Sequence, residues 1–371
     1  MALTNFAAMQ DHEYLAWARE TWKQLRERSF IMQRVGTSSD SGIQKISELS
    51  STPAGNKAII NLLHDLMEDG VVGDQTLEGN EESAKASQID LVVDQVRHGI
   101  TNTGRMSDQK GVLKIRNEAK DLLAYMMADR IDQMAFLTMA GVTYDNHTDG
   151  SARVGTPWTS LEFAPYVKPP SANRHYRWAS ASSSLQPGNT AAVDPADTLS
   201  YRSLVELKAA AHDLFIRPLR YDGGLEYYEV YLHPQALKSL KLDPDFQNSL
   251  RYAMPRSPDN PIFKAQEVYY VDGLAIYPYR HSFNTRNATT KWGAAGDVVG
   301  NRVTLMGAQG LAYAELGAPM WDEEMEDYNA RWGIAVSQIL GFLKPQFPDQ
   351  RISGSPKEDF GMLSMDVALK L

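Results

Sequence analysis

Two groups of acidic side chains come closest, in this 371-residue chain, to a pattern that does chemistry. The first group is Asp145, His147, Asp149 and Gly150, which resembles the opening of a calcium-binding loop because ligand-type side chains alternate before a glycine. Position twelve of such a loop carries a bidentate glutamate, whereas Thr156 stands there and a proline-rich segment follows. We therefore expect no calcium site at this place.

The second group is an acidic run near the carboxyl end of the chain. It consists of Asp322, Glu323, Glu324, Glu326 and Asp327. Clustered carboxylates can hold a cation or act as a paired general acid and base, and the solvated face of a structural element gives the same pattern. The run therefore carries one alternative hypothesis for the whole chain, a metal-dependent hydrolase.

Most other catalytic chemistry is excluded by residues and motifs that the sequence lacks. It contains no cysteine, which removes disulfides, thiolate catalysis and cysteine-based metal sites together. The GxxxxGK phosphate loop, the GxSxG nucleophile turn and the HExxH metal pair are also missing, and the eight histidines are scattered singly. We predict a structural protein that is not an enzyme and that has no metal and no cofactor.

Charge and hydropathy limit the partners further. The formal net charge of −9 argues against the chain as a whole coating nucleic acid, because phosphate binding relies on clustered lysine and arginine. No apolar run approaches the ~20 residues that cross a bilayer, and residues 1–10 lack the pattern of a secretory signal. We expect a globular protein that is made in a cytoplasm and has no membrane contact.

The amino-terminal segment is predicted to form an amphipathic helix. Over residues 9–30 apolar side chains recur at steps of three and four, and Arg19, Lys23 and Arg26 lie on another face. Two interpretations remain open for this basic face. It is either solvated, or it belongs to a mobile arm that contacts a neighbouring subunit or enclosed nucleic acid.

A long hairpin arm is predicted next. Residues 56–64 and 89–100 are rich in Ile, Leu and Val, and the stretch between them is polar and carries several turn-forming residues. Glu78, Glu81 and Glu82 crowd near its tip. An isolated two-stranded ribbon is marginally stable in water, so a neighbouring subunit is its natural support.

A long helix is predicted over residues 112–140, which contain neither proline nor glycine and are followed by Gly141. At ~1.5 Å per residue this helix exceeds roughly 40 Å, which suits a brace in an elongated subunit. The spacing assigns Ala119, Leu122 and Met126 to its apolar face. Aspartate in place of Leu122 is therefore expected to unfold the subunit.

The remainder predicts a mixed α+β chain. Residues 142–200 are rich in Pro, Ser, Asn and Gly and are expected to form an inserted surface loop. A helix is predicted over 201–215 and a second one beginning near Pro234. The predicted strands are residues 226–232, 267–279, 302–306, 332–343 and 361–369.

Several short segments resemble, in order, the major capsid proteins of coliphage N four and its relatives. These segments are residues 77–82, 94–98, 104–107, 232–237, 306–309, 341–344 and 359–361. The order of arm, hairpin, long helix, mixed region and returning strands is similar to the shell subunit of tailed phages with the Hong Kong 97 type fold. Residues 142–200 carry the weakest likeness.

This resemblance implies an α+β fold of the Hong Kong 97 type with named parts. It implies an N-terminal arm, an E-loop hairpin, a long spine helix, a peripheral domain and an axial domain. The implied ranges are 1–45 for the arm, 46–103 for the E-loop, 104–200 with 325–371 for the peripheral domain, including the inserted loop at about 142–200, and 201–324 for the axial domain.

The resemblance also implies a function and partners. The chain would assemble with its own copies into hexamers and pentamers of an icosahedral phage head that encloses the DNA genome. A scaffolding protein, a decoration or cement protein and the packaged DNA, contacted non-specifically on the inner face, are the implied partners. The implied place of work is the virion, after assembly in the host cytoplasm. A portal or decoration protein is the alternative of the same class.

Charged side chains are the predicted contacts between subunits. The acidic tip calls for a basic receiving surface. The candidates, taken together, are Arg19, Lys23, Arg26, Glu78, Glu81, Glu82, Arg116 and Lys120. Because a relative of this class is crosslinked between Lys and Asn, Lys85 is the candidate for such a crosslink, but nothing near it in the sequence marks it as reactive and we expect no crosslink.

Overall fold

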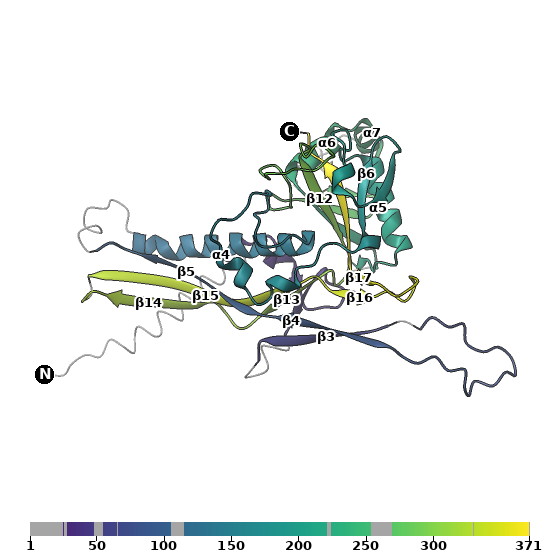
Figure 1. Cartoon of the computed structure of the whole chain (residues 1–371), viewed down its shortest axis with the longest axis horizontal. Helices are drawn as coiled ribbons and strands as arrows, with labels where there is room; N and C mark the ends of the chain where they lie inside the picture. Colours follow the sequence, from purple (N-terminus) through teal and green to yellow (C-terminus); the bar gives the residue numbers. More distant parts are fainter. Residues whose placement is uncertain are drawn as a thin grey trace.

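The computed structural model describes residues 25, 28–47, 55–64, 66–104, 115–220, 224–253, 269–328 and 330–370. This part of the chain forms three features in space: a lobe, a long helix that lies along a ribbon of strands, and a hairpin arm that projects in the opposite direction from the ribbon (Figure 1). Helices and strands both contribute, so the predicted α+β class is confirmed. Among these residues no helix is long and apolar enough to span a bilayer.

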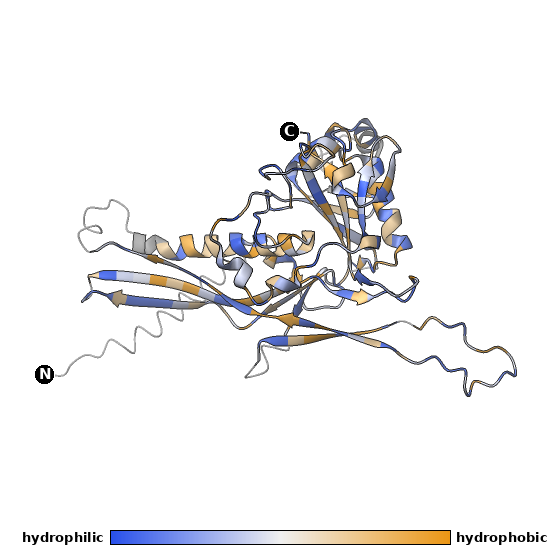
Figure 2. Ribbon diagram, in the orientation of Figure 1, coloured by the Kyte–Doolittle hydropathy of each residue, from blue (hydrophilic) through white to orange (hydrophobic). Residues whose placement is uncertain are grey.

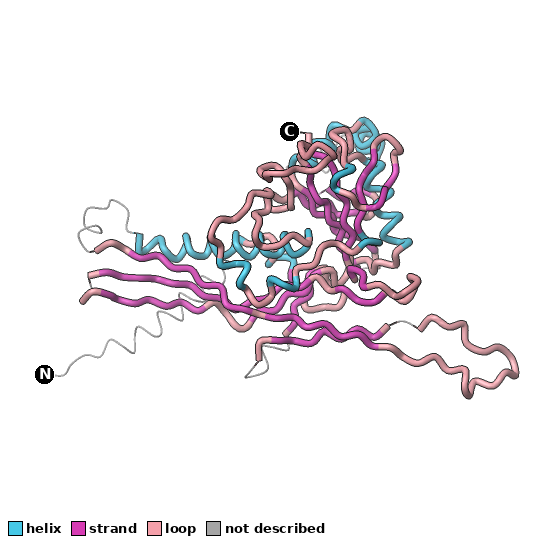
Figure 3. Tube along the Cα trace, in the orientation of Figure 1, coloured by secondary structure: helices cyan, strands magenta, loops and turns pink. Residues whose placement is uncertain are grey.

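A six-stranded sheet forms the ribbon and its base, and its strand order is β1-β2-β13-β15-β14 with β5 paired to β15. β15 organises this sheet because it pairs antiparallel with β14, with β5 and, at its carboxyl end, with β13. In the trace, β5, β14 and β15 run side by side away from the lobe (Figure 3). The strands are β1 (Val35–Gly36), β2 (Ile43–Ile46), β5 (Asp94–Thr101), β13 (Leu311–Glu315), β14 (Met320–Glu326) and β15 (Arg331–Leu343).

The long helix α4 (Ile115–Ala140) packs along β15 and β5. Its buried face contains Leu123, Met127 and Ile131 at four-residue steps, and Trp332 and Ile334 of β15 belong to the same core cluster. The predicted helix is therefore present. The assignment of Leu122 to the buried face was wrong, because Leu122 lies about 100° around the helix from Leu123 and is 53% exposed.

An eight-stranded sheet forms the lobe, with strand order β10-β11-β9-β12-β18-β6-β7 and β8 paired to β9. β12 and β18 form its centre and are buried along their whole length. Most of their side chains are apolar, and the charged pair Arg302 and Asp366 is buried because the two side chains bond each other. The strands are β6 (His175–Ala179), β7 (Ser184–Pro187), β8 (Leu219–Arg220), β9 (Glu226–Leu232), β10 (Tyr269–Val271), β11 (Leu274–Pro278), β12 (Gly300–Met306) and β18 (Met362–Ala368).

Three helices cover one face of this sheet, namely α5 (Tyr201–Asp213), α6 (Pro234–Leu242) and α7 (Pro244–Ala253). α5 begins where predicted because the Ser200 hydroxyl accepts the Ser203 N–H and the Ser203 hydroxyl bonds back. Together with β9, β12 and β18 these helices enclose a second core cluster that includes Leu204, Val303 and Leu305. The lobe thus has a core of its own.

Residues 142–200 are not the surface loop that their composition predicts. β6 enters the lobe sheet beside β18, and Phe163, Trp178 and Leu199 are buried. The segment also forms the short 3-10 helices η2 (Pro157–Ser160), η3 (Ala164–Tyr166), η4 (Ala172–Arg174) and η5 (Thr190–Ala192). The polar residues permit this burial because they bond one another, as where Asp197 accepts hydrogen bonds from Ser180 and from the Asp194 N–H.

The hairpin arm is formed by β3 (Lys57–Leu63) and β4 (Ala86–Val92), paired antiparallel from Lys57 opposite Val92 to Leu63 opposite Ala86. The predicted strand over 89–100 is divided, because Val93 separates β4 of the arm from β5 of the ribbon. A smaller hairpin of β16 (Gln346–Pro348) and β17 (Lys357–Asp359) and the 3-10 helix η1 (Met32–Arg34) complete the described elements.

Candidate functional site

The loop that ends the hairpin arm combines exposed apolar side chains with carboxylates. Val72 is 78% exposed and Leu77 is 56% exposed. Residues 64–85 contain seven acidic residues but a single lysine, Lys85, and no arginine. Figure 2 shows this loop, at the far end of the arm, as a mainly hydrophilic trace with apolar interruptions. Such a surface suits contact with another macromolecule better than isolation in water.

The three predicted contact carboxylates of this loop differ in their roles. Glu82 accepts hydrogen bonds from the Met67 N–H at 2.8 and 2.9 Å and from the Glu68 N–H at 2.8 Å. These bonds lower the pKa of the Glu82 carboxyl, and the bond from the Glu68 N–H has the largest effect. Glu81 accepts the Gly79 N–H at 2.8 Å. Glu82 therefore closes the neck of the loop, while Glu78 and Glu81 remain at its exposed end.

The basic candidates are placed only in part. Arg19, Lys23 and Arg26 lie outside the described residues, and for Arg116 only the backbone, in the first turn of α4, is described. Lys120 is half-buried near the start of α4. That end of α4 and the tip of the hairpin arm lie at opposite ends of the molecule (Figure 1). A contact between Lys120 and the acidic tip therefore requires two subunits.

The acidic run 322–327 lies on β14 and, at Asp327, in the turn that follows it. Since neighbouring residues of a strand point to opposite faces, Asp322, Glu324 and Glu326 share one face and Glu323 points to the other. Among the residues that the structure describes, no three His, Asp or Glu side chains are grouped to hold a metal ion. The hydrolase hypothesis thus gains no geometric support.

The turn at 145–150 is held by protein donors. The Asp149 carboxylate accepts hydrogen bonds from the N–H and hydroxyl of Ser151 and from the Asn287 side chain. Burial raises the pKa of Asp149, but these bonds outweigh it and lower the pKa overall. The carboxylate is thus used to fix a turn.

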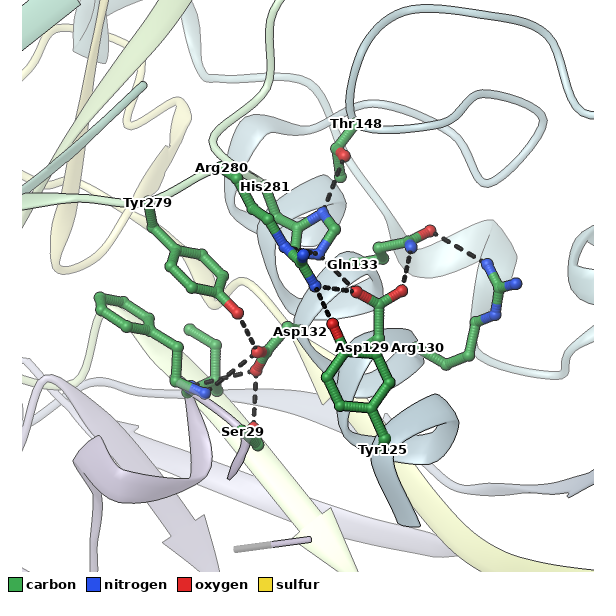
Figure 4. A network of polar contacts seen from close by, with 12 residues as sticks. Ser29, Tyr125, Asp129, Arg130, Asp132, Gln133, Thr148, Tyr279, Arg280 and His281 are labelled. Atoms are coloured by element: carbon green, nitrogen blue, oxygen red, sulfur yellow. Dashed lines mark hydrogen bonds and ion pairs between the residues drawn. The ribbon is translucent and has the colours of Figure 1, made fainter. Parts of the chain in front are cut away.

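A polar joint, shown in Figure 4, connects the segment before η1, the helix α4 and the segment after β11. Asp132 is 1% exposed and accepts four hydrogen bonds. The donors are the Ser29 hydroxyl at 2.6 Å, the N–H groups of Phe30 at 3.0 Å and Ile31 at 3.1 Å, and the Tyr279 hydroxyl at 2.6 Å. One carboxylate therefore joins three parts of the chain that are more than a hundred residues apart.

Asp129, one turn before Asp132, forms the charged half of the joint. Its carboxylate accepts hydrogen bonds from Arg280 at 2.5 Å, from His281 at 2.9 Å and from Gln133 at 2.7 Å. Burial alone would raise the pKa of Asp129, but the hydrogen bond and charge of His281, with Arg280 and Gln133, lower it to about 2. The Asp129 carboxyl is therefore ionised at neutral pH.

Asp129→Asn is expected to destabilise the subunit by about 1 kcal/mol at pH 7, after allowance for solvent screening. Because the folded-state pKa of about 2 lies below the usual 3.8, the stabilisation is complete above pH 3.8 and is lost as pH falls through about 2. Chemical unfolding at a series of pH values checks this, with Asp121→Asn on the exposed side of α4 as control. A difference between wild type and Asp129→Asn that does not change with pH contradicts it.

Comparison with known proteins decides the family. Residues 5–371 match the family described as phage capsid protein. The major capsid protein of Pseudomonas phage KPP25 is 45% identical over 368 residues, which are 98% of this chain and 97% of that protein. The chain belongs to the phage capsid protein family. Members of this family are structural components of the virion and not enzymes, and this chain is a major capsid protein of a phage head.

Solved capsids share the fold. The capsid of Ralstonia phage GP4 matches with a TM-score of 0.74 and 24% identity over 93% of this chain and 92% of that chain. The capsid unit of cyanophage Pam1 matches with a TM-score of 0.71 and 20% identity over 92% of each chain. The capsid of Helicobacter pylori bacteriophage KHP30 matches with a TM-score of 0.65 and 12% identity, again over 92% of each chain. The predicted mixed α+β phage capsid fold of the Hong Kong 97 type is confirmed.

Proposed function

We propose that this capsid protein assembles with its own copies into the hexamers and pentamers of an icosahedral head that encloses DNA. The hairpin arm carries the proposal. Its two-stranded sheet leaves Ile59 and Leu63 48% and 69% exposed, and its loop leaves the side chains of Leu66, Val72 and Leu77 largely in water. An isolated hairpin of this kind is marginally stable, and contact with a neighbouring subunit would bury these side chains.

The parts of the subunit follow from this proposal. We assign α4 as the spine helix, residues 46–103 as the region of the E-loop and 1–45 as the N-terminal arm. For the peripheral domain (104–200 and 325–371) and the axial domain (201–324) the sheets suggest one change. β6, β7 and β18 pair with the strands of the lobe, so we group 175–187 and 362–368 with the axial domain.

The closer relationship and the partners belong to the same proposal. We place the chain in the group of major capsid proteins that resemble that of coliphage N four, on the short segments quoted from the sequence. Its partners would be a scaffolding protein, a decoration or cement protein and the packaged DNA on the inner face, with assembly in the host cytoplasm. Arms that engage different patches on the next copy give the heterologous contacts that a closed shell needs.

The experiment is assembly of the purified chain. Electron microscopy of the protein, expressed with its scaffolding partner, should reveal closed shells or free hexamers and pentamers. A chain that remains a folded monomer under every assembly condition contradicts the proposal. Copy number in a purified particle, read from a stained gel, separates a major capsid protein from a portal or decoration protein, which are present in other numbers.

Charge reversal at the tip tests the arm. Glu78→Lys combined with Glu81→Lys should lower the yield of particles about tenfold, which corresponds to ~1.4 kcal/mol per assembly step. The subunit should stay folded, because both side chains are exposed. Glu206→Lys with Asp297→Lys, two exposed positions of the lobe, gives the same change of charge away from the tip. Normal shells from the Glu78 and Glu81 variant remove the electrostatic role.

A further inference from the structure

A lysine and an aspartate are enclosed together where the ribbon sheet ends and the lobe sheet begins. Lys344 directly follows β15, and Asp359 ends β17, shortly before β18. The hairpin of β16 and β17 lies at the base of the lobe (Figure 1). The side chain of Lys344 is 1% exposed, that of Asp359 is fully buried, and Nζ lies 3.1 Å from Oδ2. An amine and a carboxyl group are therefore held in contact away from water.

The surroundings of Lys344 disfavour its charged form. Burial lowers the pKa of the Lys344 amine, and the opposing attraction of Asp359 does not cancel this effect. The positive charge of Arg302 lowers the same pKa further. Arg302 is bonded to the Asp366 carboxylate at 2.8 and 3.2 Å. The neutral amine, which is the nucleophilic form of lysine, is thus favoured more here than at the surface.

The Asp359 carboxyl group is fixed by donors from two other segments. The Gln346 side-chain amide donates to Oδ1 at 2.7 Å, and the Ser171 N–H donates to Oδ2 at 3.2 Å. The Ser171 hydroxyl in turn accepts the Asp359 N–H at 3.1 Å. These bonds hold the carboxyl group against the amine, and they would stabilise the negative charge that grows on its oxygens during attack at Cγ.

We propose that Lys344 and Asp359 condense, once the chain has folded, into an amide bond within the subunit. The ammonium gives one proton to the carboxylate, and the neutral amine then attacks Cγ. The bond between Nζ and Cγ forms, the bond between Cγ and Oδ2 breaks, and Oδ2 leaves as water with the two protons that the nitrogen has lost. Oδ1 remains as the amide carbonyl, and one proton remains on Nζ. Atoms and charge balance between these two side chains alone.

The amide removes a cost that the ion pair carries. A lysine and an aspartate buried together must offset the lost hydration of two charges, whereas an amide is neutral and keeps one donor and one acceptor. The bond closes a ring of residues 344–359 and ties the end of the ribbon sheet to the lobe. Such a ring restricts the unfolded chain as a disulfide does, and this chain has no cysteine from which to form a disulfide.

The intact mass of the purified, denatured subunit tests the bond, and this measurement does not depend on assembly. The wild-type chain should be lighter than its sequence mass by about 18 Da, the mass of one water, once any loss of Met1 is counted. Lys344→Met keeps an unbranched side chain without the amine, so it should show no such deficit. A wild-type chain of full mass overturns the proposal, and so does a deficit that remains in Lys344→Met.

Tryptic peptides locate the bond. Cleavage after Arg331, Arg351 and Lys357 separates the part of the chain that carries the lysine from the part that carries the aspartate. Residues 332–351 and 358–370 should nevertheless appear as one branched species in mass spectrometry. Recovery of the two peptides only as separate species overturns the proposal.

The matched control is the pair of Lys208 and Asp272. Its Nζ and Oδ1 are also 3.1 Å apart, but the two side chains are 26% and 46% exposed. Its peptides should separate after digestion, because hydrated charges do not become a neutral amine and acid. Equal linkage of the exposed and the buried pair would overturn the proposal, since contact and not burial would then be the cause.

Discussion

Replacing Met127 with aspartate is expected to abolish folding of the subunit. Met127 is fully buried on α4, in the core cluster that contains Leu123, Ile131 and Trp332. The change removes buried apolar surface and places a carboxylate among apolar groups, which together cost about 5 kcal/mol or more. Because whole domains are stable by about 5–15 kcal/mol, most of the stability is lost. Circular dichroism, the soluble fraction and the urea midpoint measure it.

The matched control is Leu122→Asp, five positions earlier on the same helix. Leu122 is 53% exposed, so its carboxylate stays hydrated and the cost should be within about 1 kcal/mol. This outcome is the reverse of the expectation from sequence spacing. A soluble Met127→Asp protein with a normal urea midpoint would contradict the packing of α4 on the ribbon, and an unfolded Leu122→Asp protein would mean that its exposed face has a structural partner.

The long helix illustrates what spacing can and cannot decide. Its existence and its end at Gly141 follow from helix-compatible residues and the glycine after them. Its buried face does not follow, because apolar residues occur on two stripes, one with Leu122 and Met126 and one with Leu123 and Met127. Which stripe is buried depends on β15, a strand nearly two hundred residues away that sequence periodicity alone cannot position.

The burial of polar segments was the second feature that the sequence did not predict. β9, β15 and α6 lie close to the predicted ranges because turn and cap residues bound apolar runs. The surface loop predicted for residues 142–200 was wrong. Serine and proline normally mark such loops, whereas here side-chain hydrogen bonds such as those of Asp197 satisfy the polar groups and allow their burial. The contact of the Arg351 guanidinium with the Phe215 ring could not be predicted either, because the two residues meet only in the folded lobe.

Asp132 gave a signal that was readable in the sequence. It lies one helical turn from the apolar residues Ala128 and Phe136 and just before the apolar run 134–137, where a buried aspartate must find donors. We expect Asp132→Ala to destabilise the subunit by about 3–5 kcal/mol, because two buried N–H groups and two hydroxyls lose their acceptor. The urea midpoint at constant slope measures the loss.

The effect should be localised as well as large. The N–H groups of Phe30 and Ile31 bond only to the Asp132 carboxylate among the bonds described for them, so their hydrogen exchange should accelerate most in Asp132→Ala. Asp121→Ala, at an exposed position of the same helix, should change the midpoint by less than about 0.5 kcal/mol. Unchanged exchange at Phe30 and Ile31 would mean that the stacking of Phe30 on Tyr279, whose ring centroids are 4.2 Å apart, holds this segment without the carboxylate. Loss of protection would instead identify Asp132 as the bond that fixes the residues before η1 to the spine of the subunit.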